Sequence, residues 1–143
     1  MEASIIISLC ALLLSVFALY QSYLSQKLTV ITNLENQLTL KAQDCNKLIN
    51  PISLGHPLNT QEVSAVVTAI LYSKGHLHLA YKNHGFLLFT CDEKDFIKFF
   101  TLQLHCSILE LIKNPLPLTV DDLTLRPIIQ EQHTVCKKFL GLP

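Results

Sequence analysis

The chain has 143 residues, with 11 basic and 11 acidic side chains and a hydrophobic share of 50%. Only 15% of its residues are charged, against roughly 25% in ordinary soluble domains, and the high apolar content excludes an intrinsically disordered chain. The neutral balance and the single arginine, Arg126, leave no basic surface for nucleic acid. The composition therefore favours a small protein that associates with a membrane or with itself.

The apolar residues are concentrated at the N-terminus. No charged residue lies between Glu2 and Lys27, and serines are the polar members of the stretch from Ala3 to Tyr20. A bilayer core of ~30 Å requires ~20 helical residues, so this stretch is long enough to span it. We predict a transmembrane signal-anchor over residues 1–23. Its representative residues are Ala3, Ile5, Leu9, Leu13, Phe17 and Tyr20.

A cleavable signal peptide is the alternative interpretation of this segment. Val16 and Ala18 are small residues at the two positions that a signal peptidase reads, which would place cleavage after Ala18. However, no Lys or Arg precedes the apolar stretch, whereas a signal peptide carries a positive start, so we favour an uncleaved anchor. Because the basic residues follow the span, beginning with Lys27, the C-terminal part is expected to face the cytosol.

The five cysteines do not form a recognisable metal or redox motif. No CxxC pair is present, which excludes the usual zinc ribbon and thioredoxin-like arrangements. In an oxidising lumen, four of the cysteines could form two disulfides, whereas in the cytosol they would serve as small buried hydrophobes. The five are Cys10, Cys45, Cys91, Cys106 and Cys136.

After the span, apolar residues continue at a helical period over residues 24–50. Neither Gly nor Pro occurs there, and the imperfect heptads predict a helix that stops at Pro51. Two interpretations remain open: a self-associating, coiled-coil stalk, which we favour, or an amphipathic helix lying against its own C-terminal domain. The predicted oligomer seam consists of Leu24, Ile31, Leu34, Leu38, Cys45 and Leu48.

Residues 51–58 contain two prolines and a glycine and are predicted to be a linker. The remaining residues, 59–143, are expected to form a small α+β head domain in the order helix, β-hairpin, helix, extended segment, helix. The first helix is predicted to end before Gly75. The hairpin follows from the alternation of residues 76–81, a turn at 82–85 and a β-type run at 86–90. The second strand is apolar on both faces, so it is expected to be the more central one, covered by helices.

The later elements of the head are predicted from helix-start and helix-stop signals. Asp92 stands where an N-cap is expected, and apolar residues at helical spacing follow it as far as Asn114. An extended segment covers residues 120–125. Pro127 then opens a last helix through Leu140, with Gly141 as its stop.

Searching for chemistry in the sequence gives mostly negative results. There is no Walker loop, GxGxxG, HExxH or GxSxG motif, so we predict a protein that is not an enzyme and has no cofactor. His76, His78 and His84 could be imagined as metal ligands around the hairpin, but exposed histidines on its wet face are the preferred interpretation. Phe96, Phe99 and Phe100 crowd one helical turn and either form the core or present a surface to a partner protein.

Taken together, the sequence predicts a non-enzymatic, single-pass membrane-anchored accessory or adaptor protein. It is expected to self-associate and to bind a protein partner through its head. This layout is similar to that of small accessory membrane proteins made by viruses, although no motif is shared. The alternative is a secreted or lumenal protein, cleaved after Ala18, whose head is held by disulfides.

Overall fold

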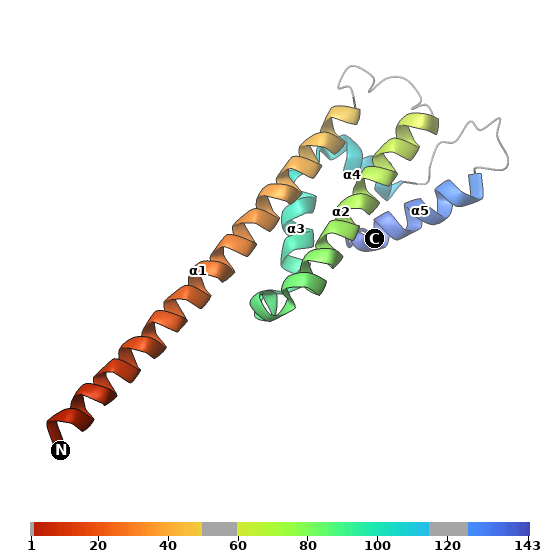
Figure 1. The fold of residues 1–143 in the computed structure, drawn as a ribbon. Helices are drawn as coiled ribbons and strands as arrows, with labels where there is room; N and C mark the ends of the chain where they lie inside the picture. The colour runs from red at the N-terminus through yellow and green to blue at the C-terminus, as the bar shows by residue number, and fades with distance from the viewer. Residues whose placement is uncertain (1, 50–59, 115–125) are drawn as a thin grey trace.

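The computed structural model describes residues 2–49, 60–114 and 126–143, and within them the chain forms helices and no strand. The helices are α1 (Glu2–Leu48), α2 (Thr60–Leu88), α3 (Glu93–Gln103), α4 (Cys106–Lys113) and α5 (Arg126–Phe139) (Figure 1). The predicted linker at 51–58 and the predicted extended segment at 120–125 lie outside the described residues.

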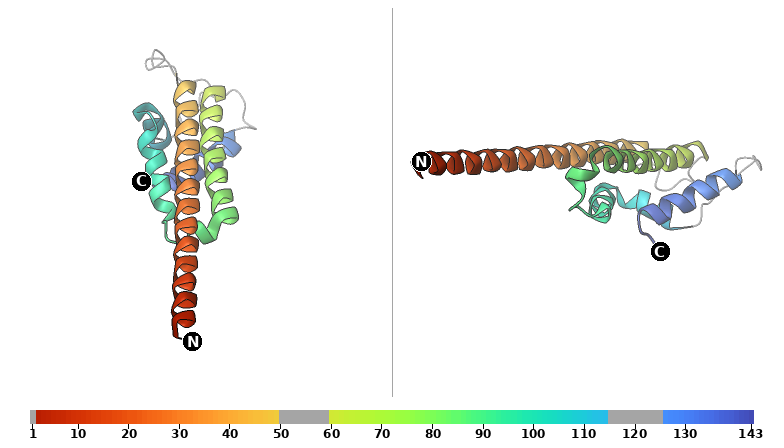
Figure 2. Two further views of the ribbon diagram at one scale, coloured as in Figure 1. Left: turned by 60° about the vertical axis from the view of Figure 1, so that its left-hand side comes forward. Right: turned by 60° about the horizontal axis from the view of Figure 1, so that its bottom comes forward.

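Helix α1 is continuous over 47 residues, or about 70 Å at the usual rise of 1.5 Å per residue. No Gly or Pro interrupts it. Its N-terminal half projects beyond the other helices, with none of them beside it (Figure 2). Its C-terminal half packs against α2 and α3. The predicted span and stalk are therefore two halves of one straight element.

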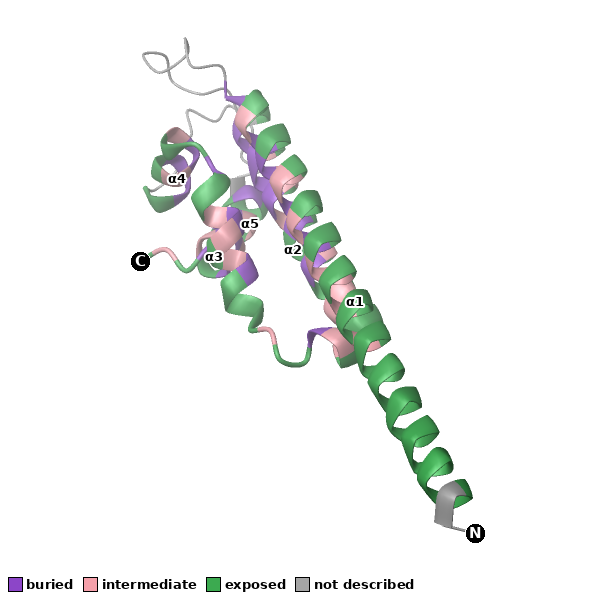
Figure 3. Cartoon of the chain, turned by 90° about the vertical axis from the view of Figure 1, so that its left-hand side faces the viewer, coloured by how far each residue is buried: buried purple, intermediate pink, exposed green. Residues whose placement is uncertain are grey.

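The core of the head is built jointly by α1 and the helices that follow it. Burial changes along α1, from fully exposed at its N-terminal half to a buried stripe where it meets the head (Figure 3). The α1 members of this core are Leu34, Leu38, Ala42 and Cys45, followed by Ile49 just after the helix, and the α2 members are Val63, Val66, Val67, Ile70, Leu77 and Leu88. Phe96, Phe100, Ile108, Ile112, Ile129 and Cys136 of the later helices complete its interior.

The predicted α+β fold with a β-hairpin is wrong, because residues 76–88 continue α2 instead. The buried face of α2 keeps its helical spacing past Gly75, from Ile70 through Ser73 to Leu77. Because Ser73 is polar, the sequence pattern does not reveal that the buried face continues from Ile70 to Leu77. In the structure its hydroxyl donates to the Ala69 carbonyl at 3.0 Å, so it sits in the apolar face with its hydrogen bond made.

The turn predicted at residues 82–85 corresponds to a kink in α2. His84 has φ −125° and ψ 24°, outside the helical region, and Gly85 follows it. The run 86–90, predicted to be a central strand, forms the last turn of α2 and the connection to α3. Only part of it is buried, because Leu88 faces the core while Phe86 and Phe89 face outward.

The prediction of a helix capped by Asp92 is confirmed at its start. The Asp92 side chain accepts a hydrogen bond from the Lys94 amide at 3.0 Å. The helix does not run to Asn114, however, because it breaks between α3 and α4. Asn46 of α1 stabilises this break: its side chain donates to the Gln103 carbonyl at 2.9 Å and accepts from the His105 amide at 2.7 Å.

The last helix agrees with its prediction. Helix α5 ends at Phe139, and Gly141 follows with φ +66°, a conformation that suits glycine. Two buried contacts attach α5 to the head. The His133 imidazole Nε2 lies 3.2 Å from the Leu111 carbonyl oxygen, and the Cys136 thiol donates to the Val67 carbonyl at 3.4 Å.

Candidate membrane anchor and adjoining surfaces

The N-terminal half of α1 is an uncovered apolar rod. Every described side chain from Ser4 to Ser22 is exposed, and the helix is long and apolar enough near the N-terminus to cross a membrane. Two of its serines are hydrogen-bonded within the helix: the Ser8 hydroxyl donates to the Ser4 carbonyl at 2.9 Å, and the Ser15 hydroxyl donates to the Ala11 carbonyl at 2.8 Å. Hydroxyls bonded to their own helix leave no bare donor in lipid. The segment is compatible with a membrane anchor.

The residues of the predicted oligomer seam have different surroundings in the structure. Leu34, Leu38 and Cys45 are buried in the chain's own core, whereas Ile31 is half-buried and Leu24 and Leu48 are exposed. The central part of the seam is therefore in contact with the head. Self-association stays a prediction, and within α1 the side chains free to carry it are those outside this buried stripe.

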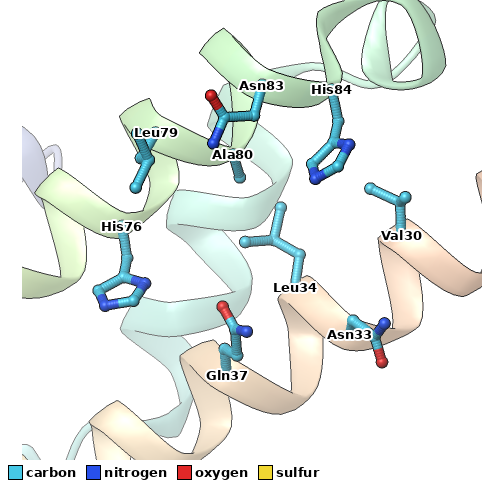
Figure 4. Close-up of a pocket in the computed structure, with 9 residues that line it drawn as sticks. All are labelled: Val30, Asn33, Leu34, Gln37, His76, Leu79, Ala80, Asn83 and His84. Carbon is cyan, nitrogen blue, oxygen red and sulfur yellow. The ribbon is translucent and has the colours of Figure 1, made fainter.

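The three histidines do not gather as they would on a strand. His76 and His84 lie two helical turns apart on α2 and both line a cavity of about 360 Å³ between α2 and α1 (Figure 4). His78 is exposed and is not part of the lining. His76 also contacts the Tyr72 ring edge-on, with centroids 4.8 Å apart. No group of three His, Cys, Asp or Glu suited to a metal occurs among the described residues.

Amides make up much of the rest of this cavity. Asn33 and Gln37 of α1 and Asn83 of α2 belong to its lining, and Leu34 lies between Gln37 and Asn83 (Figure 4). The cavity is open, and its lining combines imidazole and amide groups with apolar side chains. We assign no chemistry to it, because histidines and amides without a carboxylate or thiol partner do not define a reaction.

The phenylalanines predicted as core or partner surface are mainly core. Phe96 and Phe100 are buried, and Phe99 is partly buried against the same cluster. Phe100 packs against Phe139 of α5 with ring centroids 6.3 Å apart, and Phe96 packs against Tyr81 of α2 at 6.2 Å. These aromatic contacts join α3 to its neighbours.

A hollow of about 490 Å³ lies beside this aromatic cluster, between α3 and the C-terminal end of the chain. Its apolar lining includes Leu102, which is 75% exposed, and Phe139. The charged side chains that line it are all basic: Lys94, Lys98 and Lys138. The hollow thus combines an apolar floor with a basic rim. The hollow could not be predicted from the sequence, because its two sides come from separate helices, with Lys98 and Lys138 lying 40 positions apart.

The five cysteines are all within the described residues, and each has a free thiol there. Burial raises the pKa of the Cys45 thiol to about 11, with a smaller contribution from the nearby Asp44 carboxylate. Burial likewise raises the pKa of Cys136 to about 12. Both thiols are therefore protonated at neutral pH and act as small core side chains, not as nucleophiles.

The predicted environment of a second aromatic pair, Phe86 and Phe89, is wrong. Phe86 and Phe89 were expected in a covered strand, but they are 78% and 75% exposed. Their surroundings include the part of α1 that follows Tyr20. The Tyr23 and Phe86 rings meet edge-on with centroids 5.7 Å apart, and the Lys27 ammonium donates to the Thr90 hydroxyl.

Comparison of the chain with protein families, with curated proteins and with solved structures found no match.

Proposed function

We propose that the protein is a non-enzymatic, single-pass membrane-anchored accessory protein that holds a small helical head at the membrane surface. The observation that carries this proposal is the uncovered apolar surface of α1 from Ser4 to Tyr20. In water, a surface of this size would associate or aggregate, whereas a bilayer covers it completely. The head beyond it has its own buried core, so anchoring and folding use different parts of α1.

We propose an uncleaved anchor with the head in the cytosol. Helix α1 continues without a break through Ala18 and Leu19, and this supports an anchor that is retained. Lys27, Lys41 and Lys47 follow the span while Glu2 is the charged residue before it, and this asymmetry supports a cytosolic head. The free thiols of all five cysteines are consistent with a reducing compartment.

We further propose that the head binds a protein partner through the hollow between α3 and α5. The partner segment that fits it carries apolar side chains for the floor around Leu102 and acidic side chains for Lys94, Lys98 and Lys138. The net charge of this rim is what selects the partner, because the apolar floor alone would accept many segments.

The anchor is tested with the full chain carrying a tag at each end. After alkaline carbonate extraction, the protein is expected to stay in the membrane pellet. Protease added to sealed membranes should remove the C-terminal tag. Release into the supernatant, or a mature protein that starts at Leu19, would contradict the proposal.

The partner surface is tested by site-specific photo-crosslinking in cells. A photoreactive amino acid at Leu102 is expected to give a defined protein adduct that disappears in the Lys98→Glu/Lys138→Glu variant. Ile128 is the matched control, because it is also an exposed apolar residue but lies on α5 outside the hollow. Equal adducts at both positions, or adducts unaffected by the charge reversal, would contradict this part of the proposal.

A further inference from the structure

The corner between α2 and α3 meets α1 at the point where the apolar span ends. Phe86 contacts the Tyr23 ring, and Thr90 accepts a hydrogen bond from Lys27. Leu19 and Ser22 of α1 also share a hollow of about 400 Å³ with Phe86 and Leu87. Two contacts and the hollow between them thus define the height of this corner along α1.

This corner carries two large aromatic side chains without cover. Phe86 and Phe89 leave 78% and 75% of their surface exposed, although Leu88 between them is fully buried. Exposure of two phenylalanines, one in the last turn of α2 and one just after it, is unfavourable in water. Burying each side chain would recover roughly 1.5–3 kcal/mol. Leu19 of α1, which is also exposed, lines the same hollow as Phe86.

The height of the corner matches the interfacial layer of a bilayer. The 18 residues from Ala3 to Tyr20 rise about 27 Å as a helix, which nearly fills a hydrocarbon core of about 30 Å. Tyr23 lies about 5 Å beyond Tyr20 and Lys27 about 10 Å beyond it. The polar layer on each side of the core is about 5–8 Å thick. Phe86, in contact with Tyr23, falls within this layer, where aromatic side chains are enriched.

Charges around the corner are mixed in sign. In the sequence next to the corner, Lys82 and Lys94 are basic and Asp92, Glu93 and Asp95 are acidic, and Lys27 of α1 reaches the corner through its hydrogen bond to Thr90. The corner therefore has no net basic character that would depend on anionic lipid, and its affinity for a bilayer would come from apolar burial.

We propose that Phe86 and Phe89 insert into the interfacial layer of the membrane that α1 spans, and so give the head a second contact with lipid. This inference rests on the proposed membrane anchor. With α1 and the corner both in the bilayer, the head is held in one orientation. The opposite end of the head, with the start of α2 and α5, then points away from the membrane.

The test uses tryptophan as a local probe, because the chain contains none. Three full-length variants are reconstituted separately into phosphatidylcholine vesicles: Phe86→Trp, Phe89→Trp and Ile128→Trp. Ile128 is 52% exposed and shares a surface with Gln61 and Ser64 at the far end of α2. Lipids brominated near the carbonyl group or near the chain end then quench tryptophan according to its depth.

For Phe86→Trp and Phe89→Trp we expect blue-shifted emission and a loss of fluorescence that is largest with the shallow bromines and unchanged by salt. Ile128→Trp should remain red-shifted and unquenched. Emission of the two corner variants like that of Ile128→Trp would overturn the inference. A blue shift without quenching by either lipid would also overturn it, because a protein surface would then cover the corner.

A Phe17→Trp variant separates failure of this inference from failure of the anchor. Phe17 lies inside the span, so its probe is quenched by brominated lipid whenever α1 crosses the bilayer. Quenching of Phe17→Trp without quenching at the corner overturns the inference alone. No quenching at Phe17→Trp contradicts the anchor itself and removes the basis of the inference. Far-ultraviolet circular dichroism of each variant verifies that the helices are intact.

Discussion

Cys45 and Cys136 link protonation to the stability of the head. Each is buried in the core, and Cys136 additionally donates to the Val67 carbonyl of α2. Burial raises the pKa of these thiols from 9.0 to about 11 and about 12. Tyr81 behaves in the same way: burial raises its pKa from 10.0 to about 12, with smaller effects of Cys91 and nearby carboxylates.

These shifts predict that the head loses stability in alkaline solution. A folded-state pKa above the unfolded-state pKa means that the folded chain holds the proton more tightly, so the stabilisation is complete below pH 9. It is lost as the pH rises from about 9 through about 11 to 12, by at most ~1.4 kcal/mol per pH unit for each group. Urea unfolding in detergent at pH 8 and pH 10.5 measures the free energy of unfolding.

The Cys45→Ala/Cys136→Ala variant is the control for this pH effect. It should start from a lower stability at pH 8, because two core side chains are smaller, but fall less steeply as the pH rises. If the free energy of unfolding of this variant fell as steeply with pH as that of the natural chain, groups other than the two thiols would cause the alkaline loss of stability.

At the level of whole elements, α1 changes its role along its length. Leu38 is 1% exposed in the core, whereas Leu28, less than three turns earlier, is 66% exposed. We predict that Leu38→Asp lowers the free energy of unfolding by more than about 3 kcal/mol, because it puts an unpaired charge among apolar side chains. Leu28→Asp should change it by no more than about 0.5 kcal/mol. Thermal unfolding followed by circular dichroism measures both.

The Leu38 variant also separates core packing from an oligomer seam. If Leu38→Asp reduced the size of an oligomer but left the unfolding temperature unchanged, Leu38 would face another copy of the chain and not α2. The structure predicts the reverse, with loss of the folded head whatever the state of association.

The helices of the head show which features the local sequence could predict and which it could not. Asp92 as an N-cap and Gly141 as a helix stop were predictable, because both signals act through their own backbone. The helix across Gly75 was not, because His76 to Leu79 alternate locally while burial against α1 selects the helical face containing Leu77. The environment of Phe86 was mistaken for the same reason, since it depends on a contact with Tyr23, 63 residues away.

Two glycine substitutions test the backbone conformation inside α2, at Gly75, and after α5, at Gly141. A Cβ at Gly75 would meet no atom within 4 Å, so Gly75→Ala should raise the free energy of unfolding by about 0.5–1 kcal/mol through better helix propensity. Gly141→Ala should lower it by roughly 1–2 kcal/mol, because the φ of +66° disfavours a side chain. Thermal unfolding of the two variants gives opposite shifts. A loss of stability in Gly75→Ala would contradict an unbroken helix there.

At the scale of the whole molecule, the apolar residues fall into two groups: those buried in the protein core and those exposed along the N-terminal half of α1. The buried core takes residues of α1 from Leu34 onward, while the residues from Ser4 to Tyr20 contribute nothing to it. The low charge of the sequence therefore has a physical location: the first 26 residues hold a single charged residue, Glu2, whereas residues after Pro51 carry eight basic and eight acidic side chains. The charges of the head balance in sign, whereas the apolar stretch between Glu2 and Lys27 has none.

This division predicts that deletion of residues 2–20 leaves a folded head that no longer needs detergent. The shortened chain should keep its helical circular dichroism and unfold cooperatively, because it retains the whole buried cluster. Phe86 and Phe89 remain uncovered without a membrane, so the shortened chain should self-associate as its concentration rises, and Phe86→Ser/Phe89→Ser should restore a monomer. Sedimentation velocity over a concentration series distinguishes the two chains. Loss of the helical signal on deletion would mean that the span contributes to folding. Association that persists in the serine variant would mean that another apolar surface of the head causes it.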